Sequence, residues 1–433
     1  MKKISVIIFI IAIALCATAT AEPMKLSLQQ AIDQTLQNNP DLKKSAFAQE
    51  SSQAALQKAK AGNYPTVTLN LGCNPPIGGT WSISGGGSNS VQSTTTNASL
   101  DLNYQLYAGG SVKYGIKQAE TILQQSDITI QKTRQSLKYD AVKAYFDVIN
   151  AKNQITVQET ALANSTEHLR VVTAQYEEGS VPKGDVLRSK VTVSTNKQAL
   201  IVARNTYSKA LLSLKNIMNI RAKTEIELTE TLSLATKNIN SEDLLTYTSK
   251  NNPDLQIAAL SIQVDEYNYK IQLAGYYPTI SLTASGFHGY NSESGGAFDY
   301  TNNLGLTIGA NLSFNLFDGY KVKSQSEVAE LQIEQDKQTL ESLKLNTDLT
   351  VNSAIDDIAA AWEVINTAQA SLASATEDLE IKQVRYESGV GTNIDVLDAQ
   401  KALTTDQTSY WEAVYKYNLS IAYLEKVTGV PVH

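Results

Sequence analysis

Asn38-Asn39-Pro40-Asp41-Leu42 recurs as Asn251-Asn252-Pro253-Asp254-Leu255, 213 positions further along the chain. Three further landmarks recur in the same order: Tyr64-Pro65-Thr66 as Tyr277-Pro278-Thr279, Gln175-Tyr176-Glu177-Glu178-Gly179 as Arg385-Tyr386-Glu387-Ser388-Gly389, and Asp185-Val186-Leu187 as Asp395-Val396-Leu397. A repeated unit of about 210 residues is too long for a solenoid repeat. The sequence therefore predicts a duplication in which each half has the same architecture.

Residues 1–21 have the pattern of a signal peptide. Two lysines precede an apolar run from Ile4 to Leu15, and Ala19-Thr20-Ala21 provides a cleavage sequence with small residues. Cys16 leaves lipoprotein processing open as an alternative. The apolar run is too short to span a membrane as a helix, so we expect an exported protein that is cleaved after residue 21.

The charge and the histidines exclude several classes of function. Removing the predicted leader leaves 34 basic residues against 43 acidic ones, and this negative balance argues against nucleic acid as a partner. His168, His288 and His433 are scattered along the chain, without the spacing of a zinc site or a catalytic triad. We therefore expect that the protein is not an enzyme and that it binds neither a cofactor nor a metal ion.

Four segments alternate apolar with polar residues and predict strands at about residues 65–73, 97–107, 278–287 and 303–317. In the second segment, for example, Leu100 and Leu102 alternate with Ser99 and Asp101. Segments of about ten residues with two distinct faces are typical of membrane strands. A half-buried sheet in a soluble domain shows the same alternation and stays open as an alternative.

The four strands form two separate hairpins in the sequence, each followed by a long helical segment. An isolated hairpin is unstable, four strands cannot close a barrel, and an open sheet edge is excluded from lipid. We therefore expect a barrel shared between chains, with eight strands from two chains or twelve from three. The connections 73–96 and 288–302 are rich in Gly, Ser, Thr and Asn, as in the outward loops of such barrels.

Long helices are predicted at residues 111–178 and 320–388, followed by return helices at 185–219 and 394–428. Apolar residues recur every seven positions along both long helices: Ala141, Val148, Ile155, Leu162, Leu169 and Tyr176, and then Val351, Ile358, Ile365, Leu372, Leu379 and Tyr386. This spacing predicts antiparallel helical hairpins that pack as coiled coils. The predicted organisation is repeat 1 at 22–220, an equatorial linker at 221–245 and repeat 2 at 246–433.

These features together resemble the TolC-type outer-membrane efflux protein family over essentially the whole mature chain. The resemblance rests on the two repeats, the Tyr-x-x-Gly turn followed by Asp-Val-Leu in each, and Asn-Pro-Asp-Leu ahead of Tyr-Pro. It implies a mainly α-helical homotrimer whose twelve-stranded barrel lies in outer-membrane lipid and continues as an α-helical barrel in the periplasm. It also implies an exit duct for a tripartite efflux or type I secretion system, joined by a periplasmic adaptor (membrane fusion protein) to an inner-membrane transporter.

The resemblance also implies roles for residues at the two helical turns. The implied gate and selectivity residues are Asp395, Asp398, Asp185, Tyr386 and Tyr176, and the implied adaptor-docking residues are Gly179, Ser180, Val181, Gly389, Val390 and Gly391. An aspartate that begins a helix also stabilises the helix by capping and through the helix dipole, which is the alternative role. Some family members have an arginine where this chain has Gly391, so a lock of that type would need Arg385 or Lys183 instead.

A second function stays open at this point. A trimeric outer-membrane adhesin or receptor would bind its target through the loops at 73–96 and 288–302. Those loops are short for such a role, whereas polar strand faces and acidic helical turns suit a duct. The sequence therefore favours the export duct.

Overall fold

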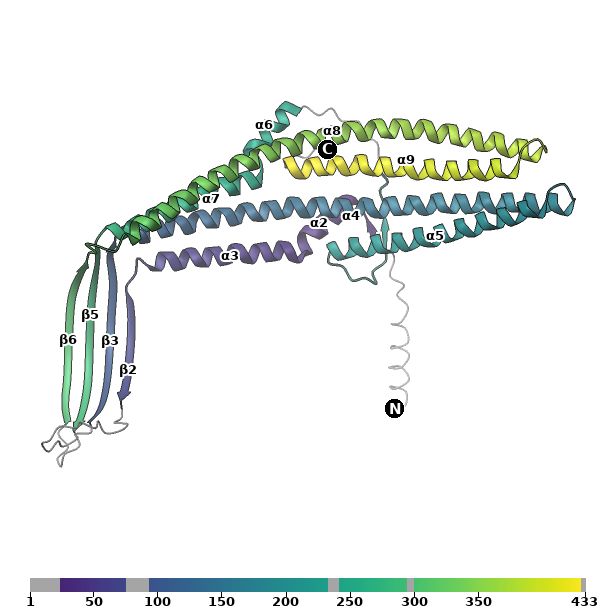
Figure 1. Ribbon diagram of the computed structural model, residues 1–433. Helices are drawn as coiled ribbons and strands as arrows, with labels where there is room; N and C mark the ends of the chain where they lie inside the picture. Colours follow the sequence, from purple (N-terminus) through teal and green to yellow (C-terminus); the bar gives the residue numbers. More distant parts are fainter. Residues whose placement is uncertain (1–23, 75–92, 233–240, 294–299, 430–433) are drawn as a thin grey trace, which may run out of the picture. The chain divides into compact units, whose positions relative to one another are not determined.

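The computed structural model describes residues 24–74, 93–232, 241–293 and 300–429 (Figure 1). The predicted signal peptide lies outside these residues. The elements are, in order, β1 Met24–Leu26, α2 Leu28–Asn38, α3 Pro40–Ala61, β2 Thr66–Asn74, β3 Ser93–Ala108, α4 Ser111–Glu177, α5 Lys183–Ile217, β4 Ile226–Leu228, α6 Ser241–Asn251, α7 Pro253–Leu273, the short 3₁₀ helix Ala274–Tyr276, β5 Thr279–Glu293, β6 Tyr300–Ser313, α8 Lys321–Glu387 and α9 Asn393–Thr428. No helix in these ranges is both long and apolar enough to cross a membrane.

The repeated Asn-Pro landmark has the same structural role in both halves. Pro40 begins α3 and Pro253 begins α7, a position that suits proline because the first helical N–H groups need no partner within the helix. The amide of Asn39 donates to the carbonyl oxygen of Ile217 at 3.0 Å, and that of Asn252 donates to Val427 at 3.2 Å. Each asparagine therefore joins the start of one helix to the end of the return helix of its own repeat.

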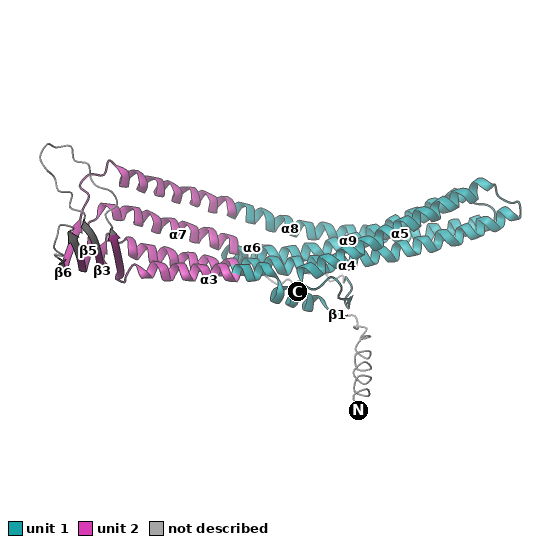
Figure 2. Cartoon of the chain, turned by 90° about the horizontal axis from the view of Figure 1, so that it is seen from below, with its two compact units in different colours: residues 1–45, 130–252, 344–433 teal, residues 46–129, 253–343 magenta. Residues whose placement is uncertain are grey.

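The chain divides into two compact units that do not follow the repeats. Unit 1 contains residues 1–45, 130–252 and 344–433, and unit 2 contains residues 46–129 and 253–343, so each unit includes segments of both repeats (Figure 2). Unit 2 contains the sheet, and unit 1 contains both helical turns. The helices α4 and α8 each contribute residues to both units.

The sheet of unit 2 has the strand order β2-β3-β5-β6, and every neighbouring pair is antiparallel. The pairs β2–β3 and β5–β6 are the two expected hairpins, and β3 of the first repeat also pairs with β5 of the second along almost its full length, which the alternation did not predict. This pairing satisfies backbone groups that would otherwise be left at two strand edges. Within the described residues, β2 and β6 each have one neighbouring strand only.

Three of the four strands reach further from the helices than the alternation predicted. β3 begins at Ser93 rather than 97, β5 continues to Glu293 rather than 287, and β6 begins at Tyr300 rather than 303. The additional residues are mostly Thr, Asn and Ser. The alternating pattern stops in these segments because polar residues occupy successive positions, although the backbone pairing continues.

The two faces of the sheet differ in polarity, as the alternation predicted. The side chain of Leu69 is 63% exposed and that of Leu304 is 82% exposed, and neither has an apolar layer covering it in the single chain. Asp101 of β3, on the other face, accepts hydrogen bonds from Asn70 of β2 at 2.7 Å, from Ser99 at 2.8 Å and from Ser285 of β5. One aspartate thus joins three strands on the polar face.

The helices of unit 2 are joined by polar contacts and by one pair of carboxyl groups. Gln125 of α4 donates to the carbonyl oxygen of Ile257 at 3.2 Å and to the hydroxyl of Ser261 at 2.9 Å, both on α7. Asp265 of α7 and Asp336 of α8 share a hydrogen bond between their carboxyl groups. Desolvation, followed by this hydrogen bond and the charge of Asp336, raises the pKa of Asp265 to about 6.

Part of the predicted seven-residue seam lies in the core of unit 1. Val351, Ala354, Ile358 and Ile365 of α8 are buried against the return helix α9. The residues of α9 in this cluster are Ala413, Val414, Tyr417, Ile421 and Leu424. Small residues such as Ala354, only 1% exposed, let the two helices approach closely.

Unit 1 also contains a small parallel pair of strands, one of which lies in the predicted equatorial linker. β1 pairs with β4 in parallel, with Met24 opposite Ile226 and Leu26 opposite Leu228. The hydroxyl of the fully buried Tyr145 donates to the carbonyl oxygen of Leu26 at 3.1 Å. A strand of three residues has no detectable period, so alternation could not reveal it.

Candidate functional site

The candidate site is the tip, defined here as the turns 178–182 and 388–392 with the adjoining ends of α4, α5, α8 and α9. Gly179 and Gly389 have φ angles of 77° and 76°, a left-handed conformation that glycine adopts without strain. The N–H of Ser180 donates to the carbonyl oxygen of Gln175 at 2.8 Å, and the N–H of Val390 donates to that of Arg385 at 3.0 Å. The two turns therefore close their helices with the same Schellman-type bonds.

The residues implied to dock an adaptor all lie in these turns. The side chain of Val390 is 68% exposed, while that of Val181 is partly buried against the apolar cluster of the tip. Gly391 lies close to the end of α8, because a Cβ atom at this position would be 3.0 Å from the backbone nitrogen of Tyr386. An arginine at position 391 would therefore require this turn to shift.

The two tip tyrosines occupy the same motif but have different surroundings. Tyr386 is 5% exposed, whereas Tyr176 is 41% exposed. Tyr386 belongs to an apolar cluster formed by both hairpins, with Val172 and Val186 from the first repeat and Val396 and Leu403 from the second. Burial, followed by the charge of Asp185, raises the pKa of Tyr386. The duplicated turn is therefore asymmetric in its packing.

Asp395 has the capping role that was the alternative to a gate role. It is the third residue of α9, and its carboxylate accepts hydrogen bonds from the N–H of Thr392 at 3.1 Å and from its hydroxyl at 2.6 Å. The hydroxyl of Thr392 in turn accepts from the N–H of Asp395 at 3.3 Å, which completes a capping box. The bonds from Thr392, with smaller contributions from Lys382 and Arg385, hold the pKa of Asp395 below its usual value.

Asp398 and Asp185 have other surroundings. Asp398 is exposed one turn further along α9, and it lines a cavity of about 440 Å³ together with Arg188, Lys401 and other residues of α5 and α9. Asp185 is partly buried in the first turn of α5, and its backbone carbonyl accepts a hydrogen bond from Asn393. Neither Arg385 nor Lys183 forms an ion pair within the described residues.

A group of three buried polar residues, here called the tip cluster, was missed by the sequence analysis. It consists of His168 on α4, Ser189 on α5 and Asn393, the first residue of α9. The side-chain oxygen Oδ1 of Asn393 lies 2.7 Å from Nε2 of His168 and accepts from the hydroxyl of Ser189 at 3.3 Å. Because His168 and Asn393 are 225 positions apart, no local pattern could connect them.

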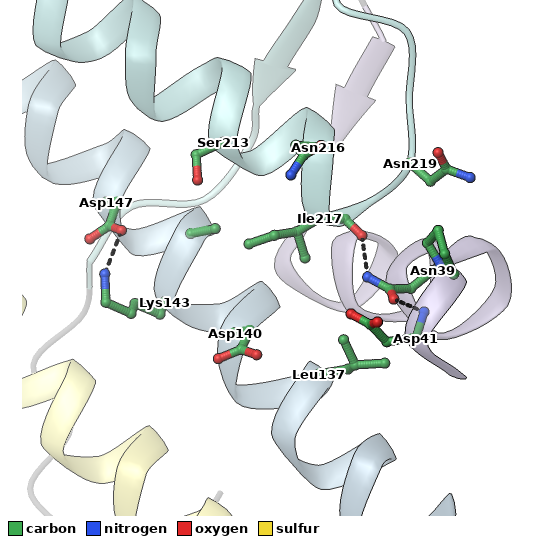
Figure 3. A pocket seen from close by; sticks show the side chains of 12 residues that line it. Asn39, Asp41, Leu137, Asp140, Lys143, Asp147, Ser213, Asn216, Ile217 and Asn219 are labelled. Carbon is green, nitrogen blue, oxygen red and sulfur yellow. Dashed lines mark hydrogen bonds and ion pairs between the residues drawn. The ribbon is translucent and has the colours of Figure 1, made fainter. Parts of the chain in front are cut away.

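A second hollow in unit 1 has a mixed lining. It measures about 500 Å³ and lies between α4 and the end of α5, where the start of α3 approaches (Figure 3). Lys143 forms an ion pair with Asp147 at 2.8 Å, and Asn39 binds the carbonyl oxygen of Ile217. The ion pair lies within α4, whereas the bond from Asn39 joins the start of α3 to the end of α5, and among these lining residues no nucleophile is paired with a base.

Comparison with known proteins identifies relatives that match this chain over almost its full length. The family described as "Outer membrane efflux protein" matches residues 31–219 and 244–430, which are the two repeats. Outer membrane protein TolC of Escherichia coli (strain K12) is 25% identical over 419 residues, covering 93% of this chain and 82% of that protein. Outer membrane efflux protein BepC of Brucella suis is 25% identical over 408 residues, covering 89% and 86%. The crystal structure of the outer membrane protein VceC from Vibrio cholerae matches with a TM-score of 0.77 at 17% identity, covering 94% and 97%.

Proposed function

The chain belongs to the outer membrane efflux protein family, and from this we propose that it is the exit duct of a tripartite efflux or type I secretion system. It is an outer-membrane channel rather than an enzyme, and its helical part extends into the periplasm. The duct would receive its cargo from an inner-membrane transporter through a periplasmic adaptor. The resemblance inferred from the sequence is confirmed by the family match.

The observation that carries the proposal is the four-stranded sheet of unit 2. Its apolar face has exposed leucines on β2 and β6 with nothing covering them in the single chain, while the other face is polar. Such a sheet suits lipid on one side and a water-filled channel on the other. Since an unpaired strand edge is excluded from lipid, β2 of one copy would pair with β6 of the next, and three copies would close twelve strands.

The helices supply a second argument for several copies. Val191 and Ile201 on α5 and Leu345 and Leu349 on α8 are exposed apolar residues of unit 1. Within the chain, Gln154 of α4 donates to the carbonyl oxygen of Thr408 of α9, while these four apolar side chains stay exposed. The free apolar faces of α5 and α8 would therefore pack against neighbouring copies in a homotrimer.

The tip would serve as the periplasmic gate and as the docking surface for the adaptor. Asp398 is exposed and makes no capping bond, so it is the better candidate for a cation-attracting ring in a trimer. Asp395, Asp185, Tyr386 and Tyr176 would line or support the same narrow end. The turns 179–181 and 389–391 would form the surface that the adaptor contacts.

The test combines assembly with a pair of matched substitutions on β6. Ile308→Lys places a charge on the exposed apolar face, and Thr307→Lys places the same charge on the opposite face. We expect purified wild-type protein to have the mass of a trimer in detergent and to conduct in planar bilayers. Ile308→Lys should lower the stability of the barrel in the membrane by about 2–4 kcal/mol and so reduce assembly. Thr307→Lys should assemble normally. A stable monomer without conductance, or equal effects of the two lysines, would contradict the proposal.

A further inference from the structure

The ends of α4 and α7 that adjoin the strands carry a group of lysines and tyrosines, here called the lysine–tyrosine patch. Its members are Lys113, Tyr114 and Lys117 of α4 and Tyr267 and Lys270 of α7. All of them belong to unit 2. The two tyrosine rings stack with their centroids 6.5 Å apart and with 23° between their planes. The stacked rings therefore join the two helices where both meet the sheet.

Each lysine of the patch places its ammonium group against these rings. The Nζ atom of Lys113 lies 5.8 Å from the centre of the Tyr114 ring, and that of Lys117 lies 5.9 Å from the centre of the Tyr267 ring. The Nζ atom of Lys270 contacts both rings, at 5.7 Å from Tyr114 and 5.5 Å from Tyr267. Separations below about 6 Å are those of cation–π contacts, so the ring pair gathers three positive charges.

These charges have no carboxylate partner within the described residues. Glu120 and Glu266 are the acidic residues nearest in sequence, and neither forms an ion pair with a lysine of the patch. All three lysines are exposed, whereas the two tyrosines are partly buried. Ammonium groups held near one another repel, and an anion among them would offset this repulsion. Charge complementarity thus indicates an anionic partner.

The patch lies directly beyond the end of the sheet. Lys113 and Lys117 are in the first two turns of α4 and Lys270 is in the last turn of α7, so all three begin within about 10 Å of the helix ends. The exposed side chains of Tyr276 and Tyr277 come between α7 and β5, and tyrosines are typical of the boundary between lipid and water. A headgroup layer is about 5–7 Å thick, and lysine side chains extend their charge toward it. The patch would therefore lie at the depth of lipid phosphates.

The lysines of α4 point to the side that a closed tube leaves outside. A Cβ atom on Gly62, which follows α3, would be 3.1 Å from Val112, and Gln118 donates to a backbone carbonyl of α7 at 3.3 Å. At 3.6 residues per turn, the arc between these two contacts is about 240° on the side of Lys113 and Lys117 and about 120° on the other side. In a tube each helix meets its neighbours toward the inside, so the wider arc faces outward. Since α4 and α7 adjoin the central strands β3 and β5, copies that pair at β2 and β6 would leave the patch uncovered.

We propose that the lysine–tyrosine patch binds the phosphate group of an anionic membrane lipid, one lipid in each copy. This inference rests on the proposed function as an outer-membrane channel. The lysines would donate charge-assisted hydrogen bonds to the phosphate oxygens, and the tyrosine rings would hold the lysines in place. The acyl chains would lie along the apolar face of the sheet, where Leu106 is exposed. Such a lipid would fix the depth at which the helices leave the membrane.

The experiment counts lipids bound to the purified full-length trimer by native mass spectrometry. Phosphatidylglycerol is the anionic probe and phosphatidylcholine is the zwitterionic one. Wild-type protein should bind up to three phosphatidylglycerol molecules per trimer, about tenfold or more tightly than phosphatidylcholine. Changing Lys113, Lys117 and Lys270 together to Gln should abolish this preference, because each lysine contributes about fivefold in affinity for an anionic lipid. Changing the same three to Arg should retain most of it.

The matched control removes the same charge elsewhere. Lys197, Lys209 and Lys223 are exposed lysines of unit 1, and none of them forms an ion pair within the described part of the chain. Changing these three to Gln should leave the preference for phosphatidylglycerol at the wild-type value. An equal loss in this control would overturn the inference, because the effect would then come from net charge.

Soluble anions distinguish the source of the phosphate group. Inorganic phosphate and glycerol 3-phosphate, added at the concentration of the lipid, should not displace phosphatidylglycerol, because they lack acyl chains. Displacement by either would show a site for soluble anions and would overturn the assignment to a lipid.

Failure of this inference differs from failure of the proposed function. Wild-type protein that forms no trimer and never conducts would contradict the function. A conducting trimer without preference for phosphatidylglycerol, or with the same preference after the three changes to Gln, would overturn the lipid site alone. If the triple variant does not assemble, Lys270→Gln decides: it should lose about fivefold in affinity, and wild-type affinity would overturn the inference.

Discussion

Replacing Asp265 by Asn should remove a pH dependence from the contact between α7 and α8. Asp265 and Asp336 share a hydrogen bond, and the pKa of Asp265 is raised from 3.8 to about 6. An acid whose pKa is higher in the folded state binds its proton more tightly there than in the unfolded chain. Its stabilising effect is complete below about pH 4 and is lost as the pH rises through about 6.

The size of this pH dependence follows from the pKa shift of Asp265 and from the solvent exposure of its side chain. A shift of this size corresponds to about 3 kcal/mol between the two limits. Only part of that change falls between about pH 5 and about pH 7.5, and solvent screening of the partly exposed Asp265 reduces it further. We therefore expect a difference of about 1 kcal/mol, which is about fivefold in the equilibrium for local opening of α7.

Hydrogen exchange of the amides in α7, corrected for the intrinsic rate at each pH, measures this local opening. Wild-type protein should lose about fivefold in protection between about pH 5 and about pH 7.5. Asp265→Asn should show no such loss, because its amide donates to Asp336 at every pH. Glu330→Gln is the control, since it removes an exposed carboxylate from α8 and should keep the wild-type dependence. The same pH dependence in wild type and Asp265→Asn would refute the shared proton.

Four other substitutions test the helices and the tip. Ala354→Leu should overpack the seam between α8 and α9 and lower thermal stability by about 1–3 kcal/mol; an unchanged melting temperature would mean that this alanine faces no partner. Asp395→Ala should cost about 1 kcal/mol by loss of the capping box and leave ion selectivity intact, whereas Asp398→Asn should reduce cation preference in bilayers without loss of stability. Gly389→Ala should cost about 1–2 kcal/mol, because its φ of 76° is left-handed, and equal stability by calorimetry would show that the turn can adopt another conformation.

Periodicity in the sequence predicted which faces of the helices and strands are buried, but not which strands are neighbours. The seven-residue spacing of Val351, Ile358 and Ile365 identified a buried seam, because periodicity reports which face of a long helix is covered. The alternation around Asp101 identified a strand with a polar face for the same reason. Pairing between the two hairpins was missed, since periodicity contains no information on which strands are neighbours.

The sequence motifs indicated where the helical turns of the tip lie, but not which contacts their side chains make. The same Tyr-x-x-Gly motif contains an exposed Tyr176 and a buried Tyr386, because burial depends on the facing hairpin and not on the motif. Asp395 looked like a gate residue, and its bonds to Thr392 became evident only from the start of α9. His168 is one of three histidines scattered along the sequence, and its partner Asn393 lies in the other repeat.

The pairing of β1 with β4 has a consequence for how the chain folds. The two strands are roughly 200 residues apart, and Tyr145, which binds Leu26, comes from between them. During synthesis the N-terminus is made first. Residues 24–26 would therefore lack their strand partner until the whole first repeat had been synthesised. Contacts between residues so distant in sequence form slowly, because a long loop must close first. The pairing of β1 with β4 is therefore expected to form late, after the helical hairpin of the first repeat.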